Sequence, residues 1–287
     1  MRKIKVAATQ MSCSWDREDT LKKADKMVRE AAGDGANIIL LQELFETPYF
    51  CQKQKVEYLK LATPLEENPA VNHFKELAKE LSVVLPISFF ERAGEITFNT
   101  VAIIDADGTV LGKYRKTHIP DGLPYAEKFY FTPGDTGFKV WKTKYATIGV
   151  GICWDQWFPE TARSLALMGA ELLLYPTAIG SEIYIDVDSR IHWQNTMRGH
   201  AAANMVPVVA SNRIGKETIE DSEMVFYGSS FIADQHGEKV LECDKETEGF
   251  ICAEFDLDAL MWERREWGIY RDRRPEMYGT IMTHGGF

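Results

Sequence analysis

Hydrophobic residues in the first part of the chain alternate between two spacings, one typical of strands and one typical of helices. The run from Ile4 to Gln10 predicts a first strand, and the apolar positions from Leu21 to Ala31 then recur every three or four residues, as in an amphipathic helix. Four apolar residues, Ile38 to Leu41, predict a second, fully buried strand. The pattern then predicts a helix over 74–81 and strands over 83–90, 97–104 and 110–114.

The second part of the chain repeats this order of elements. Thr147 to Ile152 is a short apolar and β-branched run, after which the spacing becomes helical from Phe158 to Met168. The other expected elements are a helix over 191–205 and strands over 172–175, 206–211, 229–234, 239–241 and 250–255. Because strand-helix units recur in both halves, we expect an α/β fold in which two sheets pack face to face with helices outside.

The chain contains no low-complexity run, linker or short repeat, so we expect a single domain over 1–287. The segment 261–287 differs from the rest. It is dense in arginine and aromatic residues and has no hydrophobic period of its own. Such residues are typical anchors of protein interfaces, so we expect this tail to pack on a partner subunit of a homo-oligomer.

Cys153 lies where the strand pattern changes to the helix pattern. Gly149 and Gly151 precede it, and Pro159 suits the first turn of the following helix, where its missing N–H is not needed. A side chain on so sharp a turn projects from the sheet, close to free backbone N–H groups, as the serine does in a nucleophile elbow. The pattern therefore leaves two interpretations, a nucleophilic thiol and a small residue of the core.

Polar residues follow two other predicted strands. Glu43 comes directly after the buried strand 38–41, and Lys116 comes after 110–114, close to His118. Open α/β sheets gather their ligands at the carboxyl ends of strands. Attack by a thiol needs a base and a donor for the oxyanion, and Glu43 and Lys116 are residues of these types. The alternatives are a solvated glutamate, a solvated lysine and a structural or catalytic His118.

Composition excludes several classes of protein. With 33 basic and 43 acidic residues the net charge is −10, which argues against nucleic acid and anionic membranes as partners. No apolar run approaches the length of about 18 residues that spans a bilayer, so we expect a soluble protein without a signal peptide. Five cysteines, none in a C-x-x-C pair, predict reduced thiols, a cytoplasmic location and no zinc or other metal site.

Taken together, the strings around the three candidate residues resemble the nitrilase superfamily of C–N hydrolases, whose three defining motifs carry Glu, Lys and Cys. The matching strings are L-L-Q-E-L-F, Y-R-K-T-H-I-P and G-I-C-W-D-Q-W-F-P-E. With A-E-K-F-Y-F-T-P-G and R-R-P-E-M-Y, the resemblance covers nearly the whole chain. It implies a four-layer α-β-β-α sandwich, pairing of subunits into dimers and larger homo-oligomers, and no cofactor. It also implies a second catalytic glutamate, and Glu127 matches its position.

The resemblance implies a mechanism as well. Glu43 takes the thiol proton, Cys153 attacks, and Lys116 with the backbone N–H of Trp154 holds the oxyanion. The string Y-P-T-A-I-G-S-E is most similar to members that hydrolyse a cationic ureido compound, a carbamoylated diamine, although Ile183 stands where a proline is expected. Such a substrate needs a carboxylate for its ammonium and apolar walls between. Glu182 is the candidate carboxylate, with Asp186 or Asp188 as alternatives, and Tyr49, Tyr125 and Trp154 are the candidate walls.

Three other functions remain open at this point. A β-ureidopropionase, a carbamoyl-amino-acid hydrolase or an ω-amidase would act on substrates with a carboxylate, for which we expect an arginine or another cation in the pocket. A non-catalytic binding protein could share the fold, but it would have no use for Glu, Lys and Cys together. A serine-type α/β hydrolase with a cysteine nucleophile needs a late histidine, whereas His236 and His284 lie in no motif.

Overall fold

The computed structural model of the chain describes residues 1–181 and 188–286. One β layer combines strands from both ends of the chain with an antiparallel meander. β1 (Lys3–Gln10) lies between β14 (Gly249–Asp256), to which it is antiparallel, and β2 (Ile38–Leu40), to which it is parallel. The meander consists of β3 (Leu85–Ala93), β4 (Ile96–Ile104) and β5 (Val110–Arg115). A parallel bridge between Ile38 and Val84 joins the two sets of strands.

The second β layer is a six-stranded sheet in the order β13-β12-β9-β8-β7-β6. Its strands are β6 (Val140–Lys142), β7 (Thr147–Val150), β8 (Leu172–Pro176), β9 (Val208–Ser211), β12 (Phe231–Ala233) and β13 (Lys239–Glu242). The three central strands β7, β8 and β9 are parallel, and the outer strands pair with them or with each other in the antiparallel sense. The carboxyl ends of β7 and β8 therefore lie at the same edge of the sheet.

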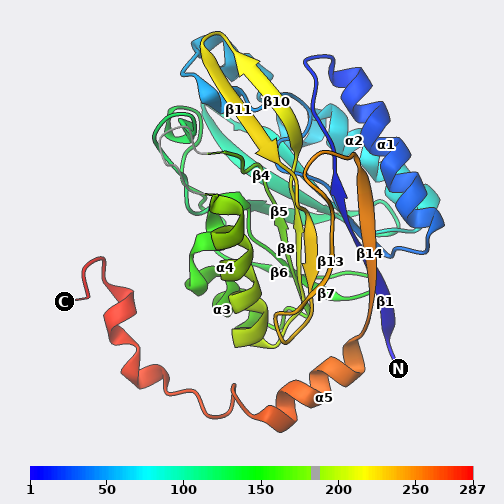
Figure 1. Cartoon of the computed structure of the whole chain (residues 1–287), viewed down its shortest axis with the longest axis vertical. Coiled ribbons are helices and arrows are strands. Elements are labelled where there is room, and N and C mark those ends of the chain that lie inside the picture. Colours follow the sequence, from blue (N-terminus) through cyan, green and yellow to red (C-terminus); the bar gives the residue numbers. More distant parts are fainter. Residues whose placement is uncertain (182–187, 287) are drawn as a thin grey trace.

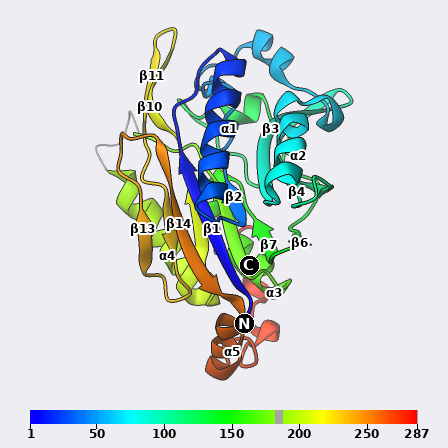
Figure 2. The same ribbon diagram turned by 90° about the vertical axis from the view of Figure 1, so that its right-hand side faces the viewer.

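Helices cover the outer face of each sheet (Figures 1 and 2). α1 (Arg17–Gly33) and α2 (Pro69–Leu81) pack on the first layer, and α3 (Pro159–Leu167) and α4 (Ser189–Asn204) pack on the second. Successive side chains of β1 point to opposite faces of the sheet, so this strand contributes to two hydrophobic cores. Val6 faces the second sheet, where it joins Val150 and Leu174, while Ala7 faces α1 and packs with Val28. The predicted four-layer α-β-β-α sandwich is confirmed.

Two strand pairings were not predicted. The hairpin of β10 (Ile214–Ile219) and β11 (Ser222–Tyr227) carries charged residues along its strands and turns at Glu220, which adopts a positive φ of 56° without a glycine. The sequence therefore lacks the usual turn signal of a hairpin. The short edge strand β6 was also missed. Seven 3-10 helices occupy the described connections: Phe50–Gln52, Val56–Leu61, Leu65–Glu67, Glu127–Phe129, Cys153–Trp157, Pro275–Met277 and Gly279–Met282.

The last helix, α5 (Leu257–Trp267), extends into the segment that was expected to be a tail from residue 261. It begins at Asp256, whose side chain accepts hydrogen bonds from two N–H groups of the first turn, and it ends at Gly268 with a positive φ of 82°. Figure 1 shows that the chain after α5 runs along one end of the sandwich and away from its body. The expected tail therefore begins within a helix, and after Gly268 it contains two short 3-10 helices, Pro275–Met277 and Gly279–Met282.

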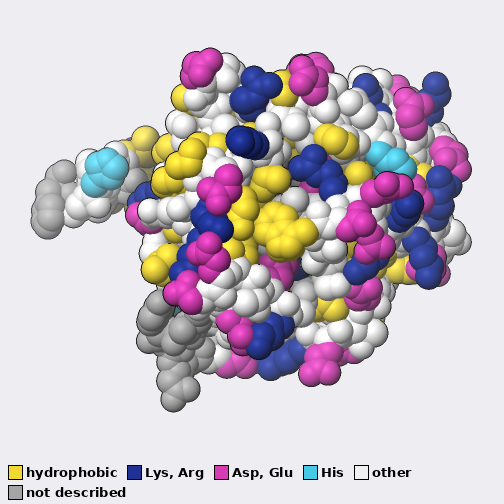
Figure 3. Space-filling view, turned by 90° about the horizontal axis from the view of Figure 1, so that it is seen from above, with side chains coloured by type: hydrophobic (Ala, Val, Ile, Leu, Met, Phe, Trp, Pro, Cys, Tyr) yellow, Lys and Arg dark blue, Asp and Glu magenta, His cyan; other side chains and the backbone are white. Residues whose placement is uncertain are grey.

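Charges of both signs are mixed on the face that Figure 3 shows. Hydrophobic side chains gather near its centre, with lysine, arginine and acidic side chains around them. The described side chains on this face thus form no continuous basic surface of the kind that holds nucleic acid. Among the helices of the described ranges, none combines the length and the apolar character that a membrane crossing requires.

Candidate active site

Cys153 occupies a tight turn between β7 and α3. It begins a 3-10 helix and has a φ of +40°, which is uncommon for any residue except glycine and is concentrated at functional sites. The turn needs Gly151, because a Cβ there would lie 2.7 Å from the ring of Tyr175. The thiol is largely buried, with Sγ 3.8 Å from the carbonyl oxygen of Ala178, two residues after β8. The local fold thus has the shape of a nucleophile elbow.

A buried carboxylate two residues further on holds this turn. Asp155 Oδ2 accepts hydrogen bonds from the Ile152 N–H at 2.9 Å and the Tyr114 hydroxyl at 2.8 Å. Its Oδ1 accepts from the backbone N–H of His118 at 3.0 Å and lies 2.7 Å from Nδ1 of the same residue. The His118 ring also stacks on Phe158, with a centroid distance of 3.6 Å. His118 therefore has structural contacts that orient it toward the turn.

Three ionisable side chains meet in the interior, two of them after strands (Glu43 and Lys116) and one at the start of a 3-10 helix (Glu127). Lys116, which follows β5, donates to Glu43 Oε1 at 2.8 Å and to Glu127 Oε2 at 2.7 Å, and all three side chains are almost completely buried. Asn99 of β4 also donates to Glu43 Oε1, at 2.7 Å. The other oxygen of Glu43, Oε2, is buried and has no hydrogen-bond partner among the described residues. It is therefore the oxygen that is free to receive a proton.

Burial and charge set the protonation states in this cluster. Burial raises the pKa of Glu127 to about 7, against the opposing charge of Lys116, and Glu43 adds to the rise. Burial also raises the pKa of the Cys153 thiol well above its usual range, and the carboxylate of Glu43 raises it further. The thiol is thus protonated at rest. Burial lowers the pKa of Lys116, but Glu127 and Glu43 together outweigh this, so the lysine stays charged.

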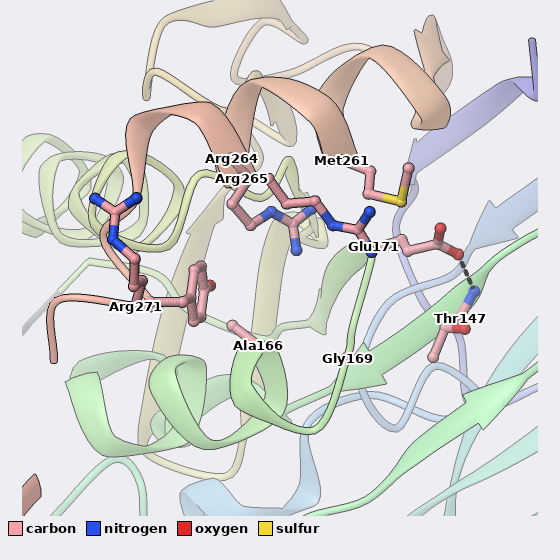
Figure 4. A pocket seen from close by; sticks show the side chains of 10 residues that line it. Thr147, Ala166, Gly169, Glu171, Met261, Arg264, Arg265 and Arg271 are labelled. Carbon is pink, nitrogen blue, oxygen red and sulfur yellow. Dashed lines mark hydrogen bonds between the residues drawn. The ribbon is translucent and has the colours of Figure 1, made fainter.

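A narrow cavity of about 30 Å³ lies beside the thiol. Its described lining consists of Pro120, Tyr125, Glu127, Cys153, Trp154, Gln156, Trp157, Ala178 and Ile179. A larger cavity of about 470 Å³ lies between α5 and the end of α3, where Arg264 and Arg265 extend into it (Figure 4). The larger cavity contains none of the predicted catalytic residues. The chemistry of the side chains, rather than the size of the cavity, therefore marks the smaller one as the candidate site.

The predicted substrate-binding residues take different places. Tyr125 and Trp154 line the small cavity, and the Trp154 N–H lies in the first turn of a helix, where such groups have no acceptor within the helix. Tyr49 is fully buried and donates its hydroxyl hydrogen to Glu127 Oε1 at 2.6 Å, so it holds Glu127 instead of forming a wall of the described cavity. Glu182, like Asp186, lies outside the described residues. Asp188 is described and caps α4, accepting from the Arg190 N–H.

Several buried polar residues around the site were not predicted. Asn99 holds Glu43, Asp155 holds the nucleophile turn, and Arg213 with Glu217 contacts the backbone after Glu43. A polar residue within the apolar strand 97–104 was the available signal for Asn99. Among the described residues, no group of three or more His, Cys, Asp and Glu side chains is arranged to hold a metal ion.

The comparisons with known proteins agree with this geometry. A family model described as carbon-nitrogen hydrolase matches residues 5–261. The chain belongs to the carbon-nitrogen hydrolase family. Its fold matches the crystal structure of a carbon-nitrogen hydrolase from Helicobacter pylori G27 with a TM-score of 0.93 and 35% sequence identity, over 99% of both chains. The expected membership of the nitrilase superfamily is thereby confirmed.

Two curated relatives align over almost the full length of this hydrolase. The N-carbamoylputrescine amidase of Oryza sativa subsp. japonica is 56% identical over 289 residues, which cover 99% of this chain and 96% of that protein. The citrullinase of Francisella tularensis subsp. tularensis is 53% identical over 283 residues, which cover 98% of this chain and 99% of that protein. Both names describe enzymes, so this hydrolase is similar over its whole length to catalytic members of the family.

Proposed function

We propose that this hydrolase converts N-carbamoylputrescine to putrescine, carbon dioxide and ammonia, as in polyamine biosynthesis. The observation that carries the proposal is the buried cluster of Glu43, Lys116 and Glu127, whose charges act on the Cys153 thiol and whose Glu127 lines the same cavity as that thiol. This cluster supplies the base and the cation that thiol attack on an amide-type carbon requires. The substrate is supported by identity of 56% over 99% of the chain to a protein named N-carbamoylputrescine amidase.

The first half of the reaction forms a covalent intermediate. Oε2 of Glu43 accepts the thiol proton, and Sγ of Cys153 attacks the ureido carbon to give a tetrahedral intermediate. Lys116 and the Trp154 N–H hold its oxyanion. The C–NH₂ bond then breaks, the proton held by Glu43 passes to the leaving nitrogen, and ammonia departs. A thiocarbamate ester between Cys153 and the diamine nitrogen remains.

The second half of the reaction restores the enzyme. Glu43 removes a proton from a water molecule, whose oxygen attacks the thiocarbamate carbon, and the C–S bond breaks with return of the proton to Cys153. The product is the carbamate of putrescine, which separates into carbon dioxide and the free diamine. Glu127 keeps Lys116 oriented between the two carboxylates throughout, because it accepts from Lys116 and from Tyr49 through different oxygens.

The charge of the cavity favours a diamine over an amino acid. The described lining includes one acidic residue, Glu127, and no arginine or lysine. A ureido compound with a carboxylate, such as citrulline, would need a cation for that group, whereas the ammonium of N-carbamoylputrescine needs an acceptor. Citrulline is the second candidate substrate, because this chain is 53% identical to a protein named citrullinase. Glu182 stays the predicted partner of the ammonium, with Asp186 and Asp188 as the alternatives.

The proposal also includes assembly. Homo-oligomers built from dimers are supported by α5, which exposes Trp262 and Trp267, and by the tail after it, which runs away from the sandwich and exposes Met277 and Met282. Tryptophan is enriched among the residues that anchor protein interfaces. The small-molecule substrate and a second copy of the chain are thus the proposed partners, and a single domain over 1–287 remains our interpretation.

Product stoichiometry tests the reaction. Incubation of the purified enzyme with N-carbamoylputrescine should release ammonia, carbon dioxide and putrescine in equal amounts, and Cys153→Ala should release none. Ammonia without putrescine would contradict the proposed breakdown of the carbamate, and no ammonia at all would contradict the substrate assignment.

A further inference from the structure

A buried arginine that takes no part in the proposed chemistry contacts the segment that carries the base. Arg213 follows β9 and is fully buried. Its Nη2 donates to the carbonyl oxygen of Glu43 at 2.7 Å and to that of Leu44 at 3.1 Å. Its Nη1 donates to the carbonyl oxygen of Thr47 at 3.3 Å and to Glu217 Oε1 at 2.8 Å. One guanidinium thus holds three carbonyl groups of the segment 43–49 and one carboxylate.

The carboxylate in turn holds the far end of the same segment. Glu217 lies on β10, and its Oε2 accepts a hydrogen bond from the Tyr49 N–H at 2.5 Å. Tyr49 is the residue whose hydroxyl donates to Glu127. The pair of Arg213 and Glu217 is therefore connected to both catalytic carboxylates, to Glu43 through its carbonyl group and to Glu127 through Tyr49.

Energetics indicate that the pair is not needed for stability alone. Burying an arginine and a glutamate costs free energy of desolvation, and apolar residues of similar volume are often as stable or more stable. The segment that the pair holds is itself strained, because Leu44 has a φ of +47° directly after Glu43. Both carbonyl groups on either side of this strained position accept from Arg213. Arg213 therefore restrains the strained backbone at Leu44, and the backbone at this point determines the direction of the Glu43 side chain.

We propose that Arg213 and Glu217 are positioning residues, which fix Glu43 and Glu127 around Lys116 by clamping the segment 43–49 between β9 and β10. The inference rests on the proposed function in one respect, that Glu43 is the base for Cys153. A displacement of a catalytic group by about 1 Å costs on the order of 100-fold in rate. Loss of the clamp therefore acts on the chemical step, while the walls of the substrate cavity stay in place.

Three variants separate positioning from stability. In Arg213→Met and in Glu217→Gln, kcat for N-carbamoylputrescine should fall by about 100-fold while KM changes by less than about threefold. The rate at which iodoacetamide alkylates Cys153 should fall as well, because the thiol then loses its aligned base. In the double variant Arg213→Met/Glu217→Leu no unpaired charge remains buried, so the melting temperature should recover toward that of the wild type. Its kcat should stay low.

Val28→Ala is the matched control, because it removes buried apolar atoms of α1 far from the clamp. It should lower the melting temperature without lowering kcat or the alkylation rate below that temperature. The proposal is overturned if the double variant regains wild-type kcat, or if Val28→Ala loses kcat in parallel with stability. If Arg213→Met does not fold, Glu217→Gln and the double variant still distinguish a positioning role from a purely structural one.

The alkylation measurement distinguishes this inference from the proposed substrate. A wild-type enzyme that releases no ammonia from N-carbamoylputrescine would contradict the substrate, yet alkylation of Cys153 would still report on its base. Wild-type alkylation rates in both Glu217→Gln and the double variant would overturn the clamp even if the substrate were correct.

Discussion

The ammonium of Lys116 lies 2.8 Å from Oε1 of Glu43, and both side chains are inaccessible to solvent. The same ammonium lies 2.7 Å from Oε2 of Glu127, so one buried positive charge is shared by two carboxylates. This arrangement occupies Oε1 of Glu43 and leaves Oε2 without a partner among the described residues. We therefore expect Oε2 of Glu43 to act as the base and the charged Lys116 to stabilise the oxyanion.

Cys153→Ala and Cys153→Ser should abolish turnover and leave the fold intact. Both replacements are close to cysteine in size and the side chain lies beside a cavity, so the packing should change little, whereas the proposed attacking group is lost. Ammonia release measures the first effect and circular dichroism the second. Retention of a tenth of wild-type activity by Cys153→Ser would refute the nucleophile.

Glu43→Gln keeps the size of the side chain and removes its ability to accept a proton. Activity should fall by about 100- to 10,000-fold, and alkylation of Cys153 near neutral pH should slow, because burial raises the pKa of the thiol. A loss of only a few-fold would instead favour His118 as the base, in spite of its contact with Asp155.

Lys116→Met should lower kcat by about 100- to 1,000-fold with a much smaller change in KM, because the lysine acts on charge that develops in the transition state. It should also lower the free energy of unfolding, since two carboxylates are left buried without their cation. Steady-state kinetics and urea titration measure the two effects. A rise in KM with unchanged kcat would show that Lys116 serves binding only.

Glu127 should make stability depend on pH. Its folded pKa is raised from an ordinary value of 4.5 to about 7, so the folded state binds the proton more tightly than the unfolded state. The stability gained from this proton is complete below pH 4.5 and is lost as the pH rises through about 7. The free energy of unfolding of the wild type, relative to that of Glu127→Gln, should therefore decrease between pH 5 and pH 8. A constant difference would contradict the raised pKa.

Deletion of residues 269–287 should lower both assembly and activity, if the tail anchors a subunit interface. Light scattering at micromolar concentration measures the mass of the full chain and of the shortened one. A monomeric full chain, or a shortened chain that keeps its oligomeric mass, would contradict the role of the tail.

The sequence predicted the layers and placed Glu43, Lys116 and Cys153 after strands. The structure brings the ends of these strands together from two facing layers, β2 and β5 from one and β7 from the other. It did not predict the hairpin of β10 and β11, whose strands carry charged residues on both sides of a turn without glycine. It also predicted that Tyr49 forms a pocket wall, whereas the Tyr49 hydroxyl donates to Glu127. The neighbouring sequence is the same in either case, so it could not distinguish the two roles.

Long-range polar contacts were beyond what the sequence could predict. Arg213 follows a strand, as Glu43 does, but an arginine there is most often a solvated residue. Its partner carbonyl groups lie about 170 positions earlier in the chain, and no pattern of spacing connects groups so far apart. Asp155 lies within a recognised motif, yet its contact with His118 depends on how two strand ends meet in space.

Hydrolysis of a cationic ureido substrate by this enzyme can be tested by the ratio of kcat/KM values between substrates. Ammonia release should be measured from N-carbamoylputrescine, from citrulline and from N-carbamoyl-β-alanine, with the wild type and with Glu182→Gln. We expect the wild type to prefer N-carbamoylputrescine by at least about 100-fold, since a carboxylate finds no arginine or lysine in the described lining. We expect Glu182→Gln to raise KM for it by tens to hundreds of fold. A higher kcat/KM for citrulline or N-carbamoyl-β-alanine would show that N-carbamoylputrescine is not the preferred substrate.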